Sequence, residues 1–261
     1  MSAHYPSDQT DEQWQLIRPL LPKRAKRGRP PIDRRDIIDA VLYLVRTGCQ
    51  WRQLPLDFPN WKTVYTVFWR WRGLGVWERI HHVLRGRVRQ RAGKRRQPTA
   101  TIMDSQSVRT AEGGEERGYD AGKKITGRKR HLAVDTLGLV WAVVVHAACW
   151  QDHEGGHFVA MALSEHCRRL KVIFADSAYA RLGLPEWIQA TFGWILQTVL
   201  RPVRAQGFVV LPKRWIIERT FSWIIRHRRN ARDYERNTDT SETMIYITMI
   251  SVMIRRLAPN C

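Results

Sequence analysis

Three carboxylate residues, Asp104, Asp176 and Glu218, are placed so that their side chains could meet. Asp104 follows the segment 99–103 and Asp176 follows the segment 172–175, and both segments are predicted to be strands. If these strands are parallel neighbours, the two aspartates share one edge of the sheet, where ligands gather in open α/β folds. Glu218 would approach from a helix. Carboxylates of this kind suit Mg²⁺, which takes oxygen ligands and keeps positions open for water and phosphate.

The chemistry that such a site supports is displacement at a phosphodiester. Two divalent ions flanked by carboxylates would hold both the attacking and the leaving oxygen. Each acid also has a structural interpretation. Asp104 could start a turn, Asp176 could cap the segment after it, and Glu218 could form a surface ion pair of small energetic value. The combination of all three favours the metal site.

Two further acids compete for the same role. Asp135 stands at a predicted hairpin turn, and Asp152 follows the apolar run 139–147. Because that run is expected to be antiparallel to the strand before Asp104, or out of register with it, we expect Asp152 to lie beside the site rather than to bind the ion.

The segment 209–229 is predicted to be the helix that positions Glu218. Its apolar residues recur at helical spacing and would face a core: Ile217, Phe221 and Ile224. Another face combines the acid with polar and basic residues: Arg214, Glu218, Ser222 and Arg229. Glu218 is therefore surrounded by cations.

The charge of the chain implies a polyanionic partner. Its 261 residues carry a formal net charge of +20, and residues 1–98 hold 21 Lys and Arg against 8 Asp and Glu. The sequence has no apolar run of about eighteen residues and no apolar signal after the first Met, so nucleic acid is favoured over a membrane. Four cysteines without a C-x-x-C pair are typical of a reduced, cytosolic chain.

Residues 1–91 are predicted to form a small all-helical domain of the helix-turn-helix type, with helices over 5–22, 32–47, 61–72 and 76–91. The helices carry basic residues that would face DNA: Lys62, Arg70, Arg72, Arg79, Arg85, Arg87 and Arg89. Between the first two helices, Arg27 and Arg29 belong to a flat basic segment that could enter an A·T-rich minor groove. The alternatives are solvated arginines on a packing module and a solvated linker.

After a basic linker at 92–98, residues 99–261 are predicted to form a mixed five-stranded sheet with helices. Strands are predicted over 99–103, 128–134, 139–147, 172–175 and 194–199. Helices are predicted over 158–169, 184–191 and 209–229, and a last helix, capped by Asp239, is predicted to continue to Leu257 with an apolar stretch over 244–257. Residues 111–127, rich in Gly and charge, are predicted to be a loop.

A basic stretch joins that loop to the second strand: Lys123, Lys124, Arg128, Lys129 and Arg130. Alternate residues of a strand face the same side, so we expect some of these cations to contact DNA.

The residues described so far lie in motifs that span almost the whole chain. The helical part contains RTGCQWRQLPLDFPNWKTVY, and the rest contains IMDSQSVRT, RGYDAGKKITGRKRHLAVDTLGL, VIFADSAYA and RWIIERTFSWIIRHRRNARDYER. With these motifs the chain resembles bacterial insertion-sequence DDE transposases of the insertion sequence 5 group. It departs in having Ser177 where relatives usually have glycine, Leu211 where they have Tyr, and Ile225 at a basic position, with Arg226 one place on.

The resemblance implies a ribonuclease H-like catalytic domain at 99–261, with Asp104, Asp176 and Glu218 as catalytic and metal-binding residues. It also implies an enzyme that binds double-stranded DNA at the terminal inverted repeats of its element. Cleavage and strand transfer would use Mg²⁺, with Mn²⁺ as a substitute and two ions in the site, in a homodimer in the bacterial cytoplasm at the nucleoid. The DNA-binding candidates are Arg27, Arg29, Lys123, Lys124, Arg128, Arg130, Arg214, Arg219, Arg226 and Arg229. A DNA-binding repressor without catalysis and a nuclease without strand transfer are the alternatives.

Overall fold

The computed structural model describes residues 5–23, 32–111, 114–199 and 213–259. By its internal contacts the chain divides into two compact units. The helical unit comprises Met1–Lys94, Ile224–Ala231 and Thr243–Cys261, and the sheet unit comprises Arg95–Trp223 and Arg232–Glu242. The first boundary falls inside the predicted linker 92–98. The predicted domain 99–261, in contrast, is shared between the two units.

The helical unit contains α1 (Asp11–Ile17), η1 (Arg18–Leu20), α2 (Arg34–Thr47), η2 (Trp51–Gln53), α3 (Trp61–Gly73), α4 (Val76–Arg91), η4 (Arg228–Asn230) and most of α8 (Thr238–Leu257). The predicted helices are confirmed, although the first is shorter than 5–22. Helix α1 begins at Asp11 because Thr10 and Gln13 form a reciprocal capping box. Helix α2 ends at Gly48, which takes the left-handed conformation with φ of 75°.

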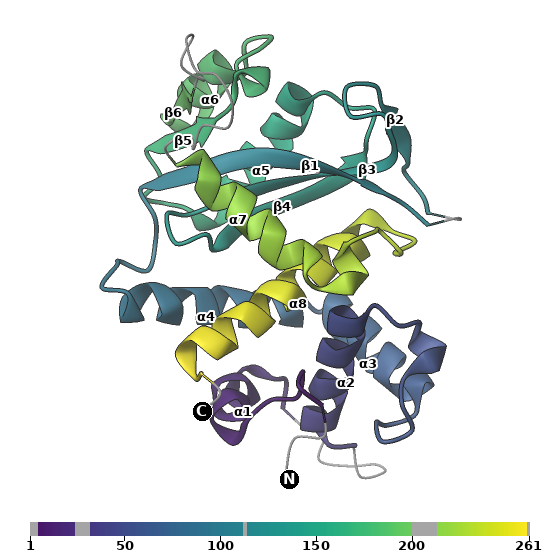
Figure 1. Ribbon diagram of the computed structural model, residues 1–261. Helices are drawn as coiled ribbons and strands as arrows, with labels where there is room; N and C mark the ends of the chain where they lie inside the picture. The colour runs from purple at the N-terminus through teal and green to yellow at the C-terminus, as the bar shows by residue number, and fades with distance from the viewer. Residues whose placement is uncertain (1–4, 24–31, 112–113, 200–212, 260–261) are drawn as a thin grey trace. The chain divides into compact units, whose positions relative to one another are not determined.

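The sheet unit contains β1 (Ala100–Arg109), β2 (Gly118–Asp120), β3 (Ile125–Val134), β4 (Val140–Ala147), β5 (Val172–Ala175) and β6 (Ile195–Thr198). Within the described residues the sheet has six strands in the order β2-β3-β1-β5-β6, and β4 also pairs with β3 (Figure 1). Strand β1 is antiparallel to β3 and parallel to β5, and β5 is parallel to β6. The mixed sheet is therefore confirmed.

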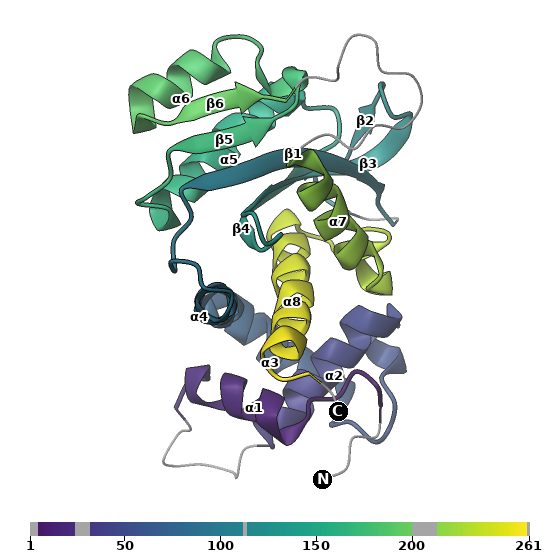
Figure 2. The ribbon, with the colours of Figure 1, turned by 60° about the vertical axis from the view of Figure 1, so that its left-hand side comes forward.

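Helices cover both faces of this sheet. Figure 2 shows α5 (Asp152–His166) and α6 (Leu184–Phe192) on one side of β1 and β5, and α7 (Arg214–Ile225) on the other. Met103 belongs to the core formed with α5 and α6. Because side chains alternate along a strand, the next residue, Asp104, faces α7.

Two predictions about the sheet unit are wrong. Part of the predicted loop 111–127 forms β2 and the start of β3, where Gly127 fits because a side chain there would lie 2.0 Å from the Val108 carbonyl oxygen. The helix predicted over 158–169 begins at Asp152 instead, where Gln151 and Glu154 form a capping box.

Helix α7 is shorter than the predicted segment 209–229. It ends at Ile225, and its predicted start falls in residues 200–212, outside the described residues. The arginines after Ile225 consequently do not share the helical face that contains Glu218.

Candidate active site

The parallel pairing of β1 and β5 places the two aspartates at one edge of the sheet. Ile102 pairs with Phe174, so continuing the register by two residues sets Asp104 opposite Asp176. Asp104 itself does not end its strand as predicted, because β1 continues along β3 to Arg109. It is the pairing with β5 that stops before Asp104, and this leaves both side chains beyond the paired segment.

Arg214 of α7 bridges the two carboxylates. Its Nη2 lies 3.4 Å from Asp104 Oδ2 and 3.8 Å from Asp176 Oδ2. Backbone N–H groups hold the other carboxylate oxygens: Ser105 N donates to Asp104 Oδ1 at 2.7 Å, and Ala178 N donates to Asp176 Oδ1 at 2.9 Å. The two aspartates thus share one cationic nitrogen, and a nearby backbone N–H group orients each of them.

The surroundings of Asp104 favour its protonated form. The pKa of this carboxyl is raised from 3.8 to about 6, because burial and, less strongly, the nearby Asp176 outweigh the Ser105 N–H and Arg214, which lower it. Below about pH 6, a cation bound between the carboxylates would therefore replace a proton.

Glu218 is exposed on α7, four residues after Arg214 and so on the same side of the helix. Among the residues that the structure describes, no three His, Cys, Asp or Glu side chains gather closely enough to hold a metal ion. The structure brings Asp104 and Asp176 together and leaves the carboxylate of Glu218 outside that pair.

Two exposed lysines lie in the turn before β3. Lys123 Nζ donates to the Ser105 carbonyl at 3.3 Å, which places the ammonium next to Asp104. Lys124 takes a left-handed conformation with φ of 53°. Both side chains are accessible, so their predicted contact with DNA stays a prediction.

The prediction that Arg128 and Arg130 contact DNA is wrong. Arg128 is 0% exposed and Arg130 is 2% exposed. Arg128 Nη1 lies 3.2 Å from Asp233 Oδ1, and Arg130 Nη2 lies 3.6 Å from Asp233 Oδ2. Strand β3 has a neighbouring strand on each side, and these two side chains pack against the segment that carries Asp233.

The arginines at the end of α7 and after it differ in exposure. Arg229 is buried and donates to the Cys49 carbonyl at 3.2 Å, so the prediction that it contacts DNA is wrong as well. Arg226 is exposed. The predicted groove-binding residues Arg27 and Arg29 lie outside the described residues.

Arg219 is partly exposed and packs between two indole rings. Its guanidinium carbon lies 4.7 Å from the ring centroids of both Trp215 and Trp223, and Nη2 donates to the Leu137 carbonyl at 3.3 Å. These contacts attach α7 to the turn between β3 and β4.

A polar cluster lies behind Asp104, on the α5 face of the sheet. Ser105 Oγ donates to Asp152 Oδ1 at 2.8 Å, and Lys129 Nζ lies 3.0 Å from the same oxygen. Asp152 is thus held beside the site by β1 and β3. The other rival, Asp135, accepts from the N–H groups of Leu137 and Leu139, as a turn residue does.

The turn after Asp176 is tied to β3 by a buried hydrogen bond that the sequence did not reveal. His131 Nδ1 lies 2.7 Å from the Tyr179 hydroxyl, and both residues are 0% exposed. Burial holds the pKa of His131 well below its usual range, so the ring is neutral at pH 7. The signal in the sequence was a Tyr three residues after Asp176, within the motif ADSAYA.

Replacing that tyrosine should destabilise the protein. Tyr179→Phe would leave His131 Nδ1 buried without its partner, and we expect the free energy of unfolding to fall by about 1–3 kcal/mol. Urea denaturation followed by circular dichroism measures this change. The exposed Tyr119 provides the control, since Tyr119→Phe should change stability by less than about 0.5 kcal/mol. Equal stability of the two variants would contradict a structural role for the hydroxyl.

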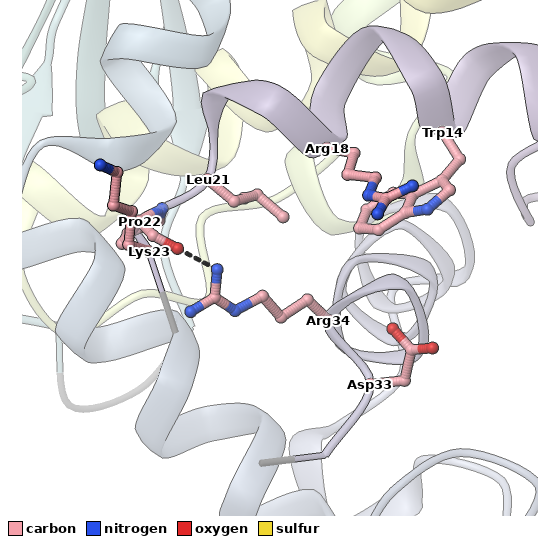
Figure 3. A pocket seen from close by; sticks show the side chains of 7 residues that line it. All are labelled: Trp14, Arg18, Leu21, Pro22, Lys23, Asp33 and Arg34. Atoms are coloured by element: carbon pink, nitrogen blue, oxygen red, sulfur yellow. Dashed lines mark hydrogen bonds between the residues drawn. The ribbon is translucent and has the colours of Figure 1, made fainter. Parts of the chain in front are cut away.

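The helical unit contains a hollow of about 560 Å³ between α1 and the start of α2 (Figure 3). The residues that line it include three cations and one acid: Trp14, Arg18, Leu21, Pro22, Lys23, Asp33 and Arg34. Arg34 donates to the Pro22 carbonyl across it. Its excess of positive charge suits an anionic group such as a phosphate.

The sheet order and the paired aspartates define a ribonuclease H-like fold with an acidic site where the parallel pairing of two adjacent strands ends. Residues 95–254 match the family model described as "Transposase DDE domain", and residues 10–81 match "Putative transposase of IS4/5 family". The chain therefore belongs to the DDE transposase family, whose members are enzymes that act on DNA and use divalent metal ions.

Two curated relatives support this assignment. The chain is 34% identical over 117 residues to the "Insertion element IS402 uncharacterized 16.2 kDa protein" of Burkholderia cepacia, covering 41% of this chain and 77% of the relative. It is 36% identical over 76 residues to "Uncharacterized protein y4sN" of Sinorhizobium fredii, covering 28% of this chain and 60% of the relative. None of the helices in the described ranges has the length and hydrophobicity needed to cross a bilayer.

Proposed function

We propose that this transposase binds the terminal inverted repeats of an insertion sequence and catalyses Mg²⁺-dependent DNA cleavage and strand transfer. The observation that carries the proposal is the register that sets Asp104 opposite Asp176, with both carboxylates within 3.8 Å of one cationic nitrogen. As a homodimer it would act on chromosomal DNA, in the bacterial cytoplasm at the nucleoid.

The residues present fit a divalent ion. Asp104 and Asp176 offer oxygen ligands only, as Mg²⁺ prefers, and Mn²⁺ accepts the same donors. Glu218 is the proposed third ligand, because it follows Arg214 by one helical turn. When bound, one or two ions would supply a water of lowered pKa and positive charge for the phosphate.

The other side chains near the pair orient groups and bind DNA. The Ser105 and Ala178 N–H groups fix the rotation of the two carboxylates. Lys123, beside Ser105, is positioned to attract a phosphate of the scissile strand. With Lys124 and Arg226 it is one of the exposed cations for which DNA contact is proposed, and Arg27 and Arg29 are proposed from the sequence alone.

The test is an incubation of the full chain with Mg²⁺ and duplex DNA that carries the ends of the element. We expect nicks at those ends, followed by joining of the new 3′ ends to target DNA. Cleavage without joined products would indicate a nuclease, and end binding without cleavage would indicate a repressor.

Acid should raise the Mg²⁺ concentration that cleavage requires, in a defined pH range. Because the pKa of Asp104 is raised to about 6, this carboxyl carries a proton below pH 6 that an ion must displace. We expect the Mg²⁺ concentration for half-maximal cleavage to rise up to about tenfold per pH unit below pH 6, and to be nearly constant above it.

The control for that titration is Asp39 in the helical unit, whose pKa burial also raises to about 6. Asp39→Asn should leave the pH dependence of the Mg²⁺ requirement unchanged. A requirement that stays constant from pH 8 to pH 5 in the unmodified chain would show that Asp104 does not compete for protons and metal.

A further inference from the structure

Helix α3 presents a regular polar and aromatic stripe to solvent. Its exposed residues recur every three or four positions: Lys62, Tyr65, Thr66, Trp69, Arg70 and Gly73. The opposite face is buried by Val64, Phe68 and Trp71. One side of α3 thus belongs to the core of the helical unit and the other has no cover among the described residues.

The helix is held firmly in place. Asn60 caps its first turn by accepting from Lys62 N at 3.0 Å, and the Trp77 indole of α4 donates to the Phe68 carbonyl at 3.4 Å. The rings of Trp71 and Trp77 lie 5.6 Å apart, centroid to centroid. The exposed stripe is therefore preorganised, which lowers the entropic cost of binding a partner.

The stripe combines aromatic rings with cations, and it contains no acid. Tyr65 is 39% exposed and Trp69 is 42% exposed, with nearly parallel rings 6.2 Å apart. The Arg72 guanidinium lies over the Trp69 ring at 3.9 Å. Large rings left open to water in this way mark an interaction surface, and the cations indicate an anionic partner.

The arginines of the neighbouring helix α4 serve the fold instead. Arg85 and Arg89 are buried, Arg79 donates to the Leu20 carbonyl, and Arg87 donates to the Leu16 carbonyl. The prediction that α4 presents a basic face to DNA is therefore wrong for Arg85 and Arg89. Lys62 and Arg70 of α3 remain as exposed cations on the solvent side of that helix.

We propose that α3 is the element that enters the major groove of duplex DNA and reads its sequence, an inference that rests on the proposed binding of element ends. A helix with its side chains is about 10–12 Å across, which fits the major groove of about 12 Å, and Lys62 and Arg70 lie eight residues, roughly 12 Å, apart along the axis. Lys62 meets a phosphate, and the Arg70 fork is the donor pattern that pairs with guanine O6 and N7. Tyr65 and Trp69 offer apolar contact to thymine methyl groups.

The connection before α3 differs from that of a standard helix-turn-helix motif. Residues 48–60, including η2, separate α2 from α3, whereas the motif uses a turn of about three or four residues.

A second copy of the chain is disfavoured as the partner that binds the stripe. A two-fold contact would bring the cations of one stripe against the same cations of the other, and the stripe has no acid to offset their repulsion.

The experiment is selection from a pool of random-sequence duplex DNA, followed by binding measurements on the selected duplex. The unmodified chain should enrich a sequence. Arg70→Ala should bind that sequence about fivefold to a hundredfold more weakly and lose the preference at one base pair, and Arg70→Lys should keep the charge without the preference. Lys62→Ala should lower the salt slope by about 1 without changing the preferred sequence.

The matched control is Lys94→Ala, which removes one exposed cation from the same unit but not from α3. Equal losses for Lys94→Ala and Lys62→Ala, or an Arg70→Ala variant that enriches the same sequence with the same affinity, would overturn the inference. So would an unmodified chain that enriches no sequence. A dimer that dissociates on Trp69→Ala, with unchanged DNA binding, would make the stripe a protein interface.

The failure of this inference and the failure of the proposed function give different results. If the Lys62 and Arg70 variants bind DNA and cleave it with Mg²⁺ as the unmodified chain does, only the assignment of α3 is refuted. Sequence selection that depends on Arg70, in a chain that never cleaves, would refute only the proposed catalysis.

Discussion

Asp104→Asn should abolish Mg²⁺-dependent cleavage while the chain stays folded and bound to DNA. The substitution keeps the shape of the side chain and removes the anionic oxygen that faces Arg214 and Asp176. Loss of a residue that only hydrogen-bonds to a metal ligand typically costs about 10–100-fold in metal affinity or activity. Loss of the ligand itself should therefore cost more than about a hundredfold. Nicking of end-containing duplex DNA measures this loss, and Asp176→Asn should behave alike.

The same variant distinguishes a missing ligand from a damaged fold. Because burial raises the pKa of Asp104, its ionised form is disfavoured in the folded state above pH 6. Asn carries no charge, so the urea midpoint of Asp104→Asn at pH 8 should not fall below that of the unmodified chain. Glu165→Gln, an exposed acid of the same unit, should cleave normally. Full cleavage activity of Asp104→Asn would show that Asp104 is not a metal ligand of the active site.

The position of the aspartates could be predicted because it depends on local patterns. The segments before Asp104 and Asp176 are short predicted strands, and the change in periodicity after residue 98 predicts a sheet. Parallel neighbours then bring the two residues to one edge, as the structure shows. The length of β1 was missed, because its second half alternates buried and partly exposed polar residues that no apolar run reveals.

The contacts of the arginines could not be predicted, because they depend on partners far away in the sequence. A strand that reads Arg128, Lys129, Arg130 predicts a solvated or DNA-facing edge from residue type alone. The acid that pairs with the buried Arg128 is Asp233, 105 positions later in the sequence. Likewise, Arg229 is buried because α7 ends at Ile225, and a helical pattern of Trp and Ile does not indicate where that end lies.

The chain offers a direct test of that reassignment in the buried cluster of Arg128. Its Nε donates to the Glu115 carbonyl at 3.1 Å, and Nη1 donates to the Glu235 carbonyl at 2.8 Å and to Asp233 Oδ1 at 3.2 Å. Arg128→Met would leave Asp233, 1% exposed, with a much weaker counter-charge. We expect the free energy of unfolding to fall by about 3–5 kcal/mol, the usual cost of breaking a buried ion pair.

The measurement is the midpoint of urea unfolding, with Lys124→Met as the control. Lys124 is an exposed cation in the turn just before the same strand, so its loss should change stability by less than about 0.5 kcal/mol. Replacing Asp233 together with Arg128 by apolar residues should recover part of the lost stability, because no unpaired charge then remains buried. If the Arg128→Met chain keeps the original midpoint of urea unfolding but binds DNA more weakly and with less salt dependence, Arg128 contacts DNA after all.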